Sequence, residues 1–136
     1  MIGSTIGSYQ ITERIGGGGI SEVWKAIDLG LDRVVAIKAL RPELAIREQV
    51  VARFRSEAQT LARLSHPNIA TLHTLLEKRD SLFMVMEYVE GETLSSMIHT
   101  AGRFDLNTAF DIFQQALDGI GHAHEVGVTP RGLRCC

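Results

Sequence analysis

The sequence predicts an α+β domain built on an antiparallel sheet. Segments with the apolar pattern of strands are joined by short glycine-rich or charged turns, and one long helical segment interrupts them. The expected element order is β-β-β-α-β-β-α-α, and strands that are joined by short turns pair in the antiparallel sense. We therefore expect a five-stranded antiparallel sheet with one large helix, followed by two further helices.

The first three strands are expected near the N-terminus. They span Tyr9 to Gly16, Glu22 to Asp28 and Arg33 to Leu40. The glycines at 16–19 end the first strand, and the segment DLGLD forms the turn between the second and third.

A large helix is expected next, because helical periodicity runs from Glu43 to about Leu64 and Pro42 suits a first helical turn. The segment SHPN at 65–68 ends it. Two more strands, Ile69 to Leu76 and Ser81 to Val89, follow on either side of the charged turn EKRD.

Two helices complete the pattern, from Thr93 to about Thr100 and from Leu106 to about His124, with Asp105 as the N-cap of the longer one. The longer helix carries an apolar stripe at spacings of four and three, made of Leu106, Phe110, Phe113, Leu117, Ile120 and His124. Such a stripe needs cover, either from the chain's own sheet or from a second copy. We expect a homodimer that forms through the C-terminal helices.

Composition excludes some functions. Hydrophobic residues make up 45% and charged residues 22% of the 136 residues, and the formal net charge is −2, so no basic field indicates a nucleic-acid partner. No segment has the length of apolar residues that a membrane span needs, and no signal peptide is recognised at the start. We expect a cytoplasmic protein without a membrane partner.

One lysine stands in an apolar strand, in the run VVAIKAL at 34–40. A buried ammonium needs a partner. Glu57 lies between Phe54 and Leu61 on the apolar stripe of the following helix, which indicates an ion pair between Lys38 and Glu57. The alternative, in which each side chain reaches water separately, stays open.

A glycine turn precedes that lysine by about twenty residues, in the segment IGGGGISEV at 15–23. Glycines let backbone N–H groups approach phosphate oxygens closely. A glycine turn alone is weak support, because hairpins use glycine routinely. The turn, the lysine strand and the helix glutamate together point more strongly to a phosphate ligand.

These segments resemble the N-terminal lobe of protein kinases, and most closely that of bacterial serine/threonine kinases. The matching segments are YQITERIGGGGISEVWKA, VVAIKAL, RFRSEAQTLARLSHPNIATL and LFMVMEYVEGETL. The resemblance covers residues 8 to 134. It implies a kinase-like N-lobe at 1–89 and, at 90–136, the hinge exit with two helices of an incomplete C-lobe whose remainder is absent.

The resemblance also implies roles for single residues. Lys38 and Glu57 match the catalytic lysine and its helix partner. Ser21 stands where the third glycine of the turn is expected, which is a departure from the family pattern. Residues that match positions around the nucleotide are Ile15, Gly16, Gly18, Gly19, Val23, Ala36, Lys38, Met86 as the gatekeeper, and Glu87 and Val89 in the hinge.

The C-terminal segment HEVGVTPRGLRCC departs most from the family. Where the family has a catalytic loop of the H-R-D type, Pro130 replaces the histidine, Arg131 matches the arginine and Gly132 replaces the catalytic aspartate. The usual Mg²⁺ ligands are not found, so no residue is assigned to a metal. The resemblance implies ATP or ADP binding with weak or no phosphoryl transfer. Two alternatives are a nucleotide-independent interaction module and a non-functional fragment of a kinase gene.

Overall fold

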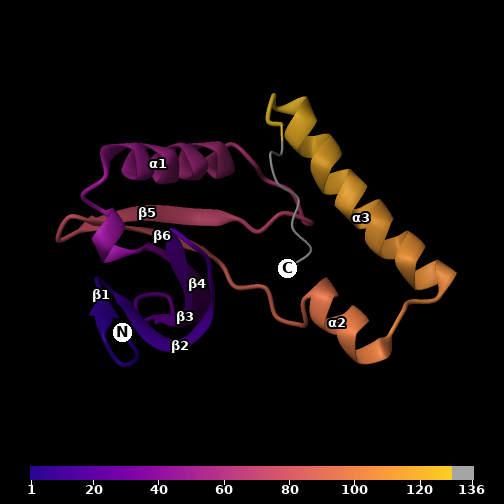
Figure 1. Cartoon of the computed structure of the whole chain (residues 1–136), viewed down its shortest axis with the longest axis horizontal. Coiled ribbons are helices and arrows are strands. Elements are labelled where there is room, and N and C mark those ends of the chain that lie inside the picture. The colour runs from indigo at the N-terminus through magenta and orange to yellow at the C-terminus, as the bar shows by residue number, and fades with distance from the viewer. Residues whose placement is uncertain (130–136) are drawn as a thin grey trace. The chain divides into compact units, whose positions relative to one another are not determined.

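The structure is a computed structural model that describes residues 1–129. It confirms the α+β class, with an antiparallel sheet and helices in the expected order (Figure 1). The strands are β1 (Thr5–Ile6), β2 (Tyr9–Gly17), β3 (Ser21–Asp28), β4 (Arg33–Leu40), β5 (Leu72–Lys78) and β6 (Ser81–Glu87). The α-helices are α1 (Glu48–Ala62), α2 (Leu94–Ala101) and α3 (Leu106–Glu125), and a 3₁₀ turn, η1 (Pro42–Leu44), precedes α1.

The sheet has six strands where the sequence predicted five. Its order is β1-β2-β3-β4-β6-β5, and every neighbouring pair is antiparallel. The additional strand, β1, is a two-residue segment in which Ile6 pairs with Tyr9. A strand of two residues is too short to show the alternation of apolar and polar residues that predicts a strand. Ile6 is buried because the hairpin places it against the sheet.

The large helix begins later than predicted. Pro42 does open a helical turn, but that turn is the separate η1, and α1 starts only at Glu48. The strand expected from Ile69 also starts later, at Leu72. In both cases the apolar pattern runs into a connecting segment, where it does not mark the end of the element.

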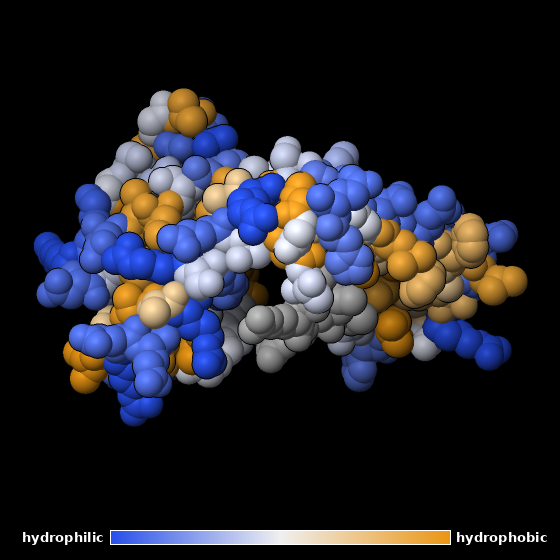
Figure 2. Space-filling view, turned by 90° about the horizontal axis from the view of Figure 1, so that it is seen from above, coloured by the Kyte–Doolittle hydropathy of each residue, from blue (hydrophilic) through white to orange (hydrophobic). Residues whose placement is uncertain are grey.

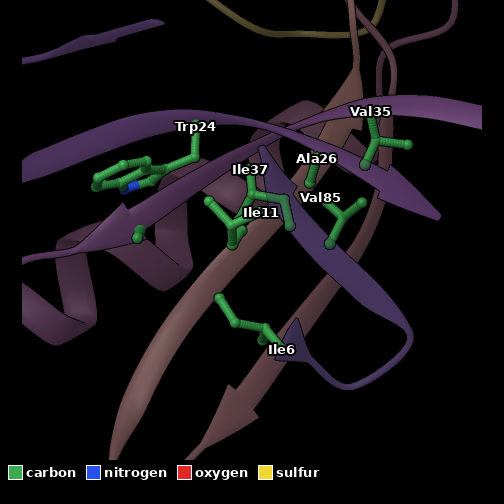
Figure 3. Close-up of a cluster of buried hydrophobic side chains, with 8 residues drawn as sticks. Ile6, Ile11, Trp24, Ala26, Val35, Ile37 and Val85 are labelled. Carbon is green, nitrogen blue, oxygen red and sulfur yellow. The ribbon is translucent and has the colours of Figure 1, made fainter. Parts of the chain in front are cut away.

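One face of the sheet carries a closed hydrophobic cluster (Figure 3). Alternate residues of β4 reach it, because side chains that lie two apart on a strand share a face. Val35 and Ile37 are fully buried there, as the sequence pattern predicted. The buried members of the cluster are Ile6, Ile11, Trp24, Ala26, Val35, Ile37, Ala39 and Val85.

The opposite face is covered by α1, which lies along β5 (Figure 1). Phe54 of α1 has no exposed surface and packs in a second cluster with Leu40, Ala58, Leu82 and Met84. The remaining β4 residues, Ala36 and Lys38, alternate with the first cluster and therefore share this second face.

The chain forms two compact units. The first comprises Met1–Arg63 and Ala70–Tyr88, and the second comprises Leu64–Ile69 together with the chain from Val89 onward. The sheet and α1 belong to the first unit, and α2 and α3 to the second. The proposed assignment of 1–89 and 90–136 to two kinase lobes stays a prediction.

Within the second unit, residues 64–69 dock on α3. The backbone N–H of Ser65 donates to Nε2 of His122 at 3.2 Å, and the side-chain amide of Asn68 donates to the carbonyl of Gln115 at 3.0 Å. The rings of His66 and His122 stack with centroids 5.3 Å apart. Gly119 belongs to the same face of α3, because a Cβ there would lie only 3.4 Å from Ile69.

The predicted apolar stripe lies on the other side of α3. At 100° per residue, it is centred almost opposite the face that contacts 64–69. Leu106 is 85% exposed, Phe110 65%, Phe113 63% and Leu117 49%. Hydrophobic side chains accordingly gather on the surface over α2 and α3 (Figure 2). Asp105 caps α3 as predicted, since its Oδ1 accepts a hydrogen bond from the N–H of Thr108 at 2.7 Å.

None of the helices within residues 1–129 has the length and apolar character that crossing a membrane requires.

Candidate functional site

The predicted ion pair between Lys38 and Glu57 is present. The Nζ atom of Lys38 lies 2.6 Å from Oε1 of Glu57 and donates a hydrogen bond to it. The same ammonium lies 6.0 Å from the ring centroid of Phe54, within the range of a cation–π interaction. The alternative of two side chains that reach water separately is therefore wrong for this structure.

Both partners are less buried than the sequence suggested. The side chain of Lys38 is 23% exposed and that of Glu57 is 40% exposed. Phe54 is fully buried, but Glu57, three residues later, lies at the edge of the buried face of α1. The pair therefore stays partly accessible to a ligand and to water.

The register of the sheet places apolar residues around this lysine. Val23 of β3 lies directly opposite Lys38 of β4, and Ala36 lies directly opposite Met86 of β6. Directly opposed residues share a face, so these four residues line the same side of the sheet. Three of the residues assigned to the nucleotide thus lie beside Lys38.

The glycine turn closes one end of this face. Gly16 pairs with Val23 across the β2–β3 hairpin. The register shifts between Arg14 and Gly16, so Ile15 is the extra residue of a bulge, and its side chain is exposed. A Cβ built on Gly18 or on Gly19 would meet nothing within 4 Å, so space beside both residues is open.

The two predicted hinge residues differ in their surroundings. The backbone N–H of Glu87 donates to the carbonyl of Thr71 at 2.8 Å, and its carboxylate accepts from the N–H of Thr71 at 3.0 Å. The backbone N–H of Glu87 is therefore already paired. Val89 belongs to the second unit, and its side chain is exposed.

Two cationic residues that the sequence did not assign to the nucleotide lie near the site. Lys25 lies opposite Ala36 on the same face of the sheet, and its Nζ lies 4.8 Å from the ring centroid of Tyr88. Arg41 donates from Nε to the carbonyl of Gly18 at 3.2 Å. The position of Lys25, two residues after Val23 on one strand, could have revealed the first; no sequence pattern indicates the contact of Arg41.

The donor set fits a nucleotide. Val23, Ala36 and Met86 offer apolar surface for a base. Lys38 offers a cation for phosphates, and the open turn offers the backbone N–H of Gly19. Within residues 1–129, no three His, Cys, Asp or Glu side chains are grouped as metal ligands would be. The departures at Pro130, Arg131 and Gly132 lie outside the described residues.

Comparison with known proteins gives a consistent result. A family model described as the protein kinase domain matches residues 9–134. The chain is 43% identical over 135 residues to the serine/threonine-protein kinase PrkC of Bacillus subtilis, and this covers 98% of the chain and 21% of that protein. It is 36% identical to the serine/threonine-protein kinase PknA of Mycobacterium tuberculosis, over 98% of the chain and 32% of that protein.

Solved structures support the same fold. The kinase domain of Mycobacterium tuberculosis PknI matches with a TM-score of 0.81 and 24% sequence identity, over 99% of this chain and 55% of that one. The chain thus spans about a fifth to a third of the two curated relatives, and little more than half of the solved kinase domain.

Proposed function

The chain belongs to the protein kinase domain family, and from this premise we propose that its first compact unit binds ATP or ADP. The proposal rests mainly on the ion pair between Lys38 and Glu57. Lys38 lies on the face of the sheet that is lined by Val23, Ala36 and Met86. A structural lysine would need only a carboxylate. This lysine also stays partly exposed, beside apolar surface and an open glycine turn.

Each residue has a distinct role in this proposal. Lys38 would contact the α- and β-phosphates, and Glu57 would hold its ammonium in place. Ile15, Val23, Ala36 and Met86 would contact the base. The turn at Gly16, Gly18 and Gly19 would face the phosphates, and the chain at Glu87 would contact adenine.

We further propose that the 136-residue chain transfers phosphate weakly or not at all. Bound ATP would supply the phosphoryl group, and transfer to a serine or threonine hydroxyl depends on positioning and charge stabilisation. Gly132 occupies the position of the aspartate that accepts the hydroxyl proton, and glycine has no side chain to do so.

A titration of the intact chain with a fluorescent ATP analogue tests the nucleotide site, with and without Mg²⁺. Lys38→Met should weaken binding about tenfold, the scale of one charge-assisted hydrogen bond. Lys78→Met is the matched control, because Lys78 lies on β5 and is exposed. ATP at ten times its dissociation constant should also stabilise the fold by about 1.4 kcal/mol.

A wild-type chain that shows neither binding nor thermal stabilisation at millimolar ATP would contradict the nucleotide proposal. Equal affinities for Lys38→Met, Lys78→Met and wild type would show that the nucleotide binds elsewhere.

A second proposal is that the chain associates with itself through α3, which would suit an interaction module. The observation that favours it is the exposure of Leu106, Phe110, Phe113 and Leu117. These four side chains form an apolar surface that a partner would bury. A second copy would pair the same face with itself by two-fold symmetry.

Sedimentation of the 136-residue chain at micromolar concentration tests this association. Phe113→Glu should convert a dimer into a monomer, because it would place an unpaired charge in the apolar contact. Asn107→Glu is the control, since it adds the same charge on the flank of α3. A wild-type chain that sediments as a monomer would contradict the proposal.

A further inference from the structure

The glycine turn is held from outside its own hairpin by one residue, Arg41. The backbone N–H of Arg41 donates to the carbonyl of Ile20 at 3.0 Å. The side-chain Nε donates to the carbonyl of Gly18 at 3.2 Å, from a residue 23 positions later in the chain. Two carbonyls of the turn are thus fixed by a single residue that directly follows β4.

Carboxylates lie on both sides of the Arg41 guanidinium. Oε1 of Glu22 lies 3.9 Å from Nη2 of Arg41 and 3.5 Å from Nε of Arg14, and Oε1 of Glu43 lies 3.8 Å from Nη1 of Arg41. Glu22 therefore bridges an arginine of β2 and the arginine after β4. These groups are partly exposed, so each ion pair alone adds little to stability.

The hydrogen bond to Gly18 has a directional consequence. No cis peptide bond occurs among residues 1–129, and in a trans peptide the C=O and the N–H point in opposite directions. Because the Gly18 carbonyl faces Arg41, the N–H of Gly19 in the same peptide points away from the guanidinium. The N–H of Gly18 itself is occupied, since it donates to the carbonyl of Ser21 at 2.8 Å.

We propose that Arg41 is a positioning residue, which fixes the Gly18–Gly19 peptide so that the Gly19 N–H is presented to a nucleotide phosphate. This inference rests on the proposed nucleotide site. A Cβ built on Gly18 or Gly19 would meet nothing within 4 Å, so no side chain packs beside them to restrict the peptide, and the Arg41 side chain adds a restraint to that of the Gly18–Ser21 hydrogen bond. Arg41 thus restricts a turn in which Ser21 replaces the third glycine of the family pattern.

The competing explanation is a direct contact between Arg41 and a phosphate. A substitution that changes the charge beside Arg41 distinguishes the two explanations. Glu22→Gln removes a negative charge beside the turn, so direct electrostatic attraction predicts tighter ATP binding. Positioning predicts weaker binding, because the same change loosens the guanidinium of Arg41. The two explanations therefore predict opposite signs for one substitution.

The experiment measures ATP and adenosine affinity together with amide hydrogen exchange over residues 17–21, all in the full chain. Arg41→Met should weaken ATP binding about tenfold, the scale of one hydrogen bond from a charged group, and leave adenosine binding unchanged. The amide of Gly18, which donates to the Ser21 carbonyl, should exchange faster. Arg53→Met, at an exposed arginine of α1, should change none of these values.

Each outcome bears on the proposal. Weaker ATP binding in both Arg41→Met and Glu22→Gln, with faster exchange in the turn, supports it. Tighter binding in Glu22→Gln, or weaker binding in Arg41→Met without faster exchange, overturns it in favour of a direct contact. If wild type binds no nucleotide, the proposed function fails. Hydrogen exchange then decides separately whether Arg41 holds the turn, and unchanged exchange overturns that too.

Discussion

The two compact units differ sharply in what they bury. Among the described residues, every buried hydrophobic residue except Ala123 belongs to the first unit, where two clusters cover both faces of the sheet. The second unit buries Gly119 and Ala123 of α3 and leaves Phe110 and Phe113 exposed. The first unit has its own core, whereas the second has large apolar residues but no core that contains them.

This difference indicates which functions each unit can support alone. A binding site is held in place by packed supporting residues, and Lys38 and Glu57 lie on elements that the Phe54 cluster joins. The second unit offers a surface instead, because four apolar residues of the stripe on α3 are exposed. We therefore expect the first unit to carry nucleotide binding, and association to depend on the second.

The largest effect that this comparison predicts is that of truncating one aromatic residue in each unit. Phe54→Ala should destabilise the first unit by about 3–5 kcal/mol, because it opens a cavity in a packed core. Phe113→Ala should change the unfolding free energy of the monomer by less than about 0.5 kcal/mol, since the ring is already exposed. Urea unfolding of both variants, followed by circular dichroism, measures the two values.

If Phe113→Ala lowers the unfolding free energy by several kcal/mol at a protein concentration where the chain is monomeric, the second unit does bury this ring, and the contrast between the two units is wrong. That loss would show that α3 folds onto a surface of its own chain. If Phe113→Ala lowers the unfolding free energy only at high protein concentration, the contrast holds, and the stabilising contact of the ring lies in a dimer.

A smaller effect is expected where residues 64–69 dock on α3. Asn68→Ala removes the hydrogen bond to the Gln115 carbonyl and should cost about 1 kcal/mol, a typical net value for one such bond. The loss should be local, with faster amide exchange in 64–69 and in α3 but not in the sheet. His99→Ala, at an exposed position on α2, is the control. Faster exchange throughout the sheet would show that the two units unfold together.

Much of the fold could be predicted because its pattern is local. The alternation of Val35 and Ile37 with Ala36 and Lys38 gave the two faces of β4, and Asp105 marked the start of α3. The short strand β1 could not be found, because two residues carry no period and Ile6 is buried only through tertiary pairing. The start of α1 was placed too early for a similar reason, since the apolar pattern continues through η1.

The candidate site was predictable where chemistry constrains a single residue. A lysine in an apolar strand requires a carboxylate, which led to Glu57 and to the ion pair that the structure contains. The contact of Arg41 with Gly18 joins residues 23 positions apart through a hydrogen bond to a backbone carbonyl, and any residue type carries that acceptor. The assignments of Ile15, Val23 and Met86 to a nucleotide depend on family resemblance and stay predictions.

The smallest predicted effect concerns the start of α3 and its dependence on pH. The hydrogen bond from the backbone N–H of Thr108 holds the pKa of Asp105 below its ordinary value. A carboxylate whose folded-state pKa is depressed stabilises the fold fully above its unfolded-state pKa, and this contribution is lost as the pH falls through the folded-state value. The first turn of α3 should therefore fray under acidic conditions and not near neutral pH.

Amide exchange of the first turn of α3, measured from neutral to acidic pH and corrected for intrinsic rates, tests this expectation. Asp105→Asn keeps a capping oxygen but cannot titrate, so its protection should stay constant where that of wild type falls. Thr93 provides an internal comparison, since it caps α2 through an uncharged hydroxyl that accepts from the N–H of Ser96 at 3.0 Å. Equal loss of protection in α2 and α3 would assign the acid effect to the second unit as a whole. A loss confined to α3, and absent in Asp105→Asn, would trace it to one carboxylate in a unit that has few other interactions to hold its helices.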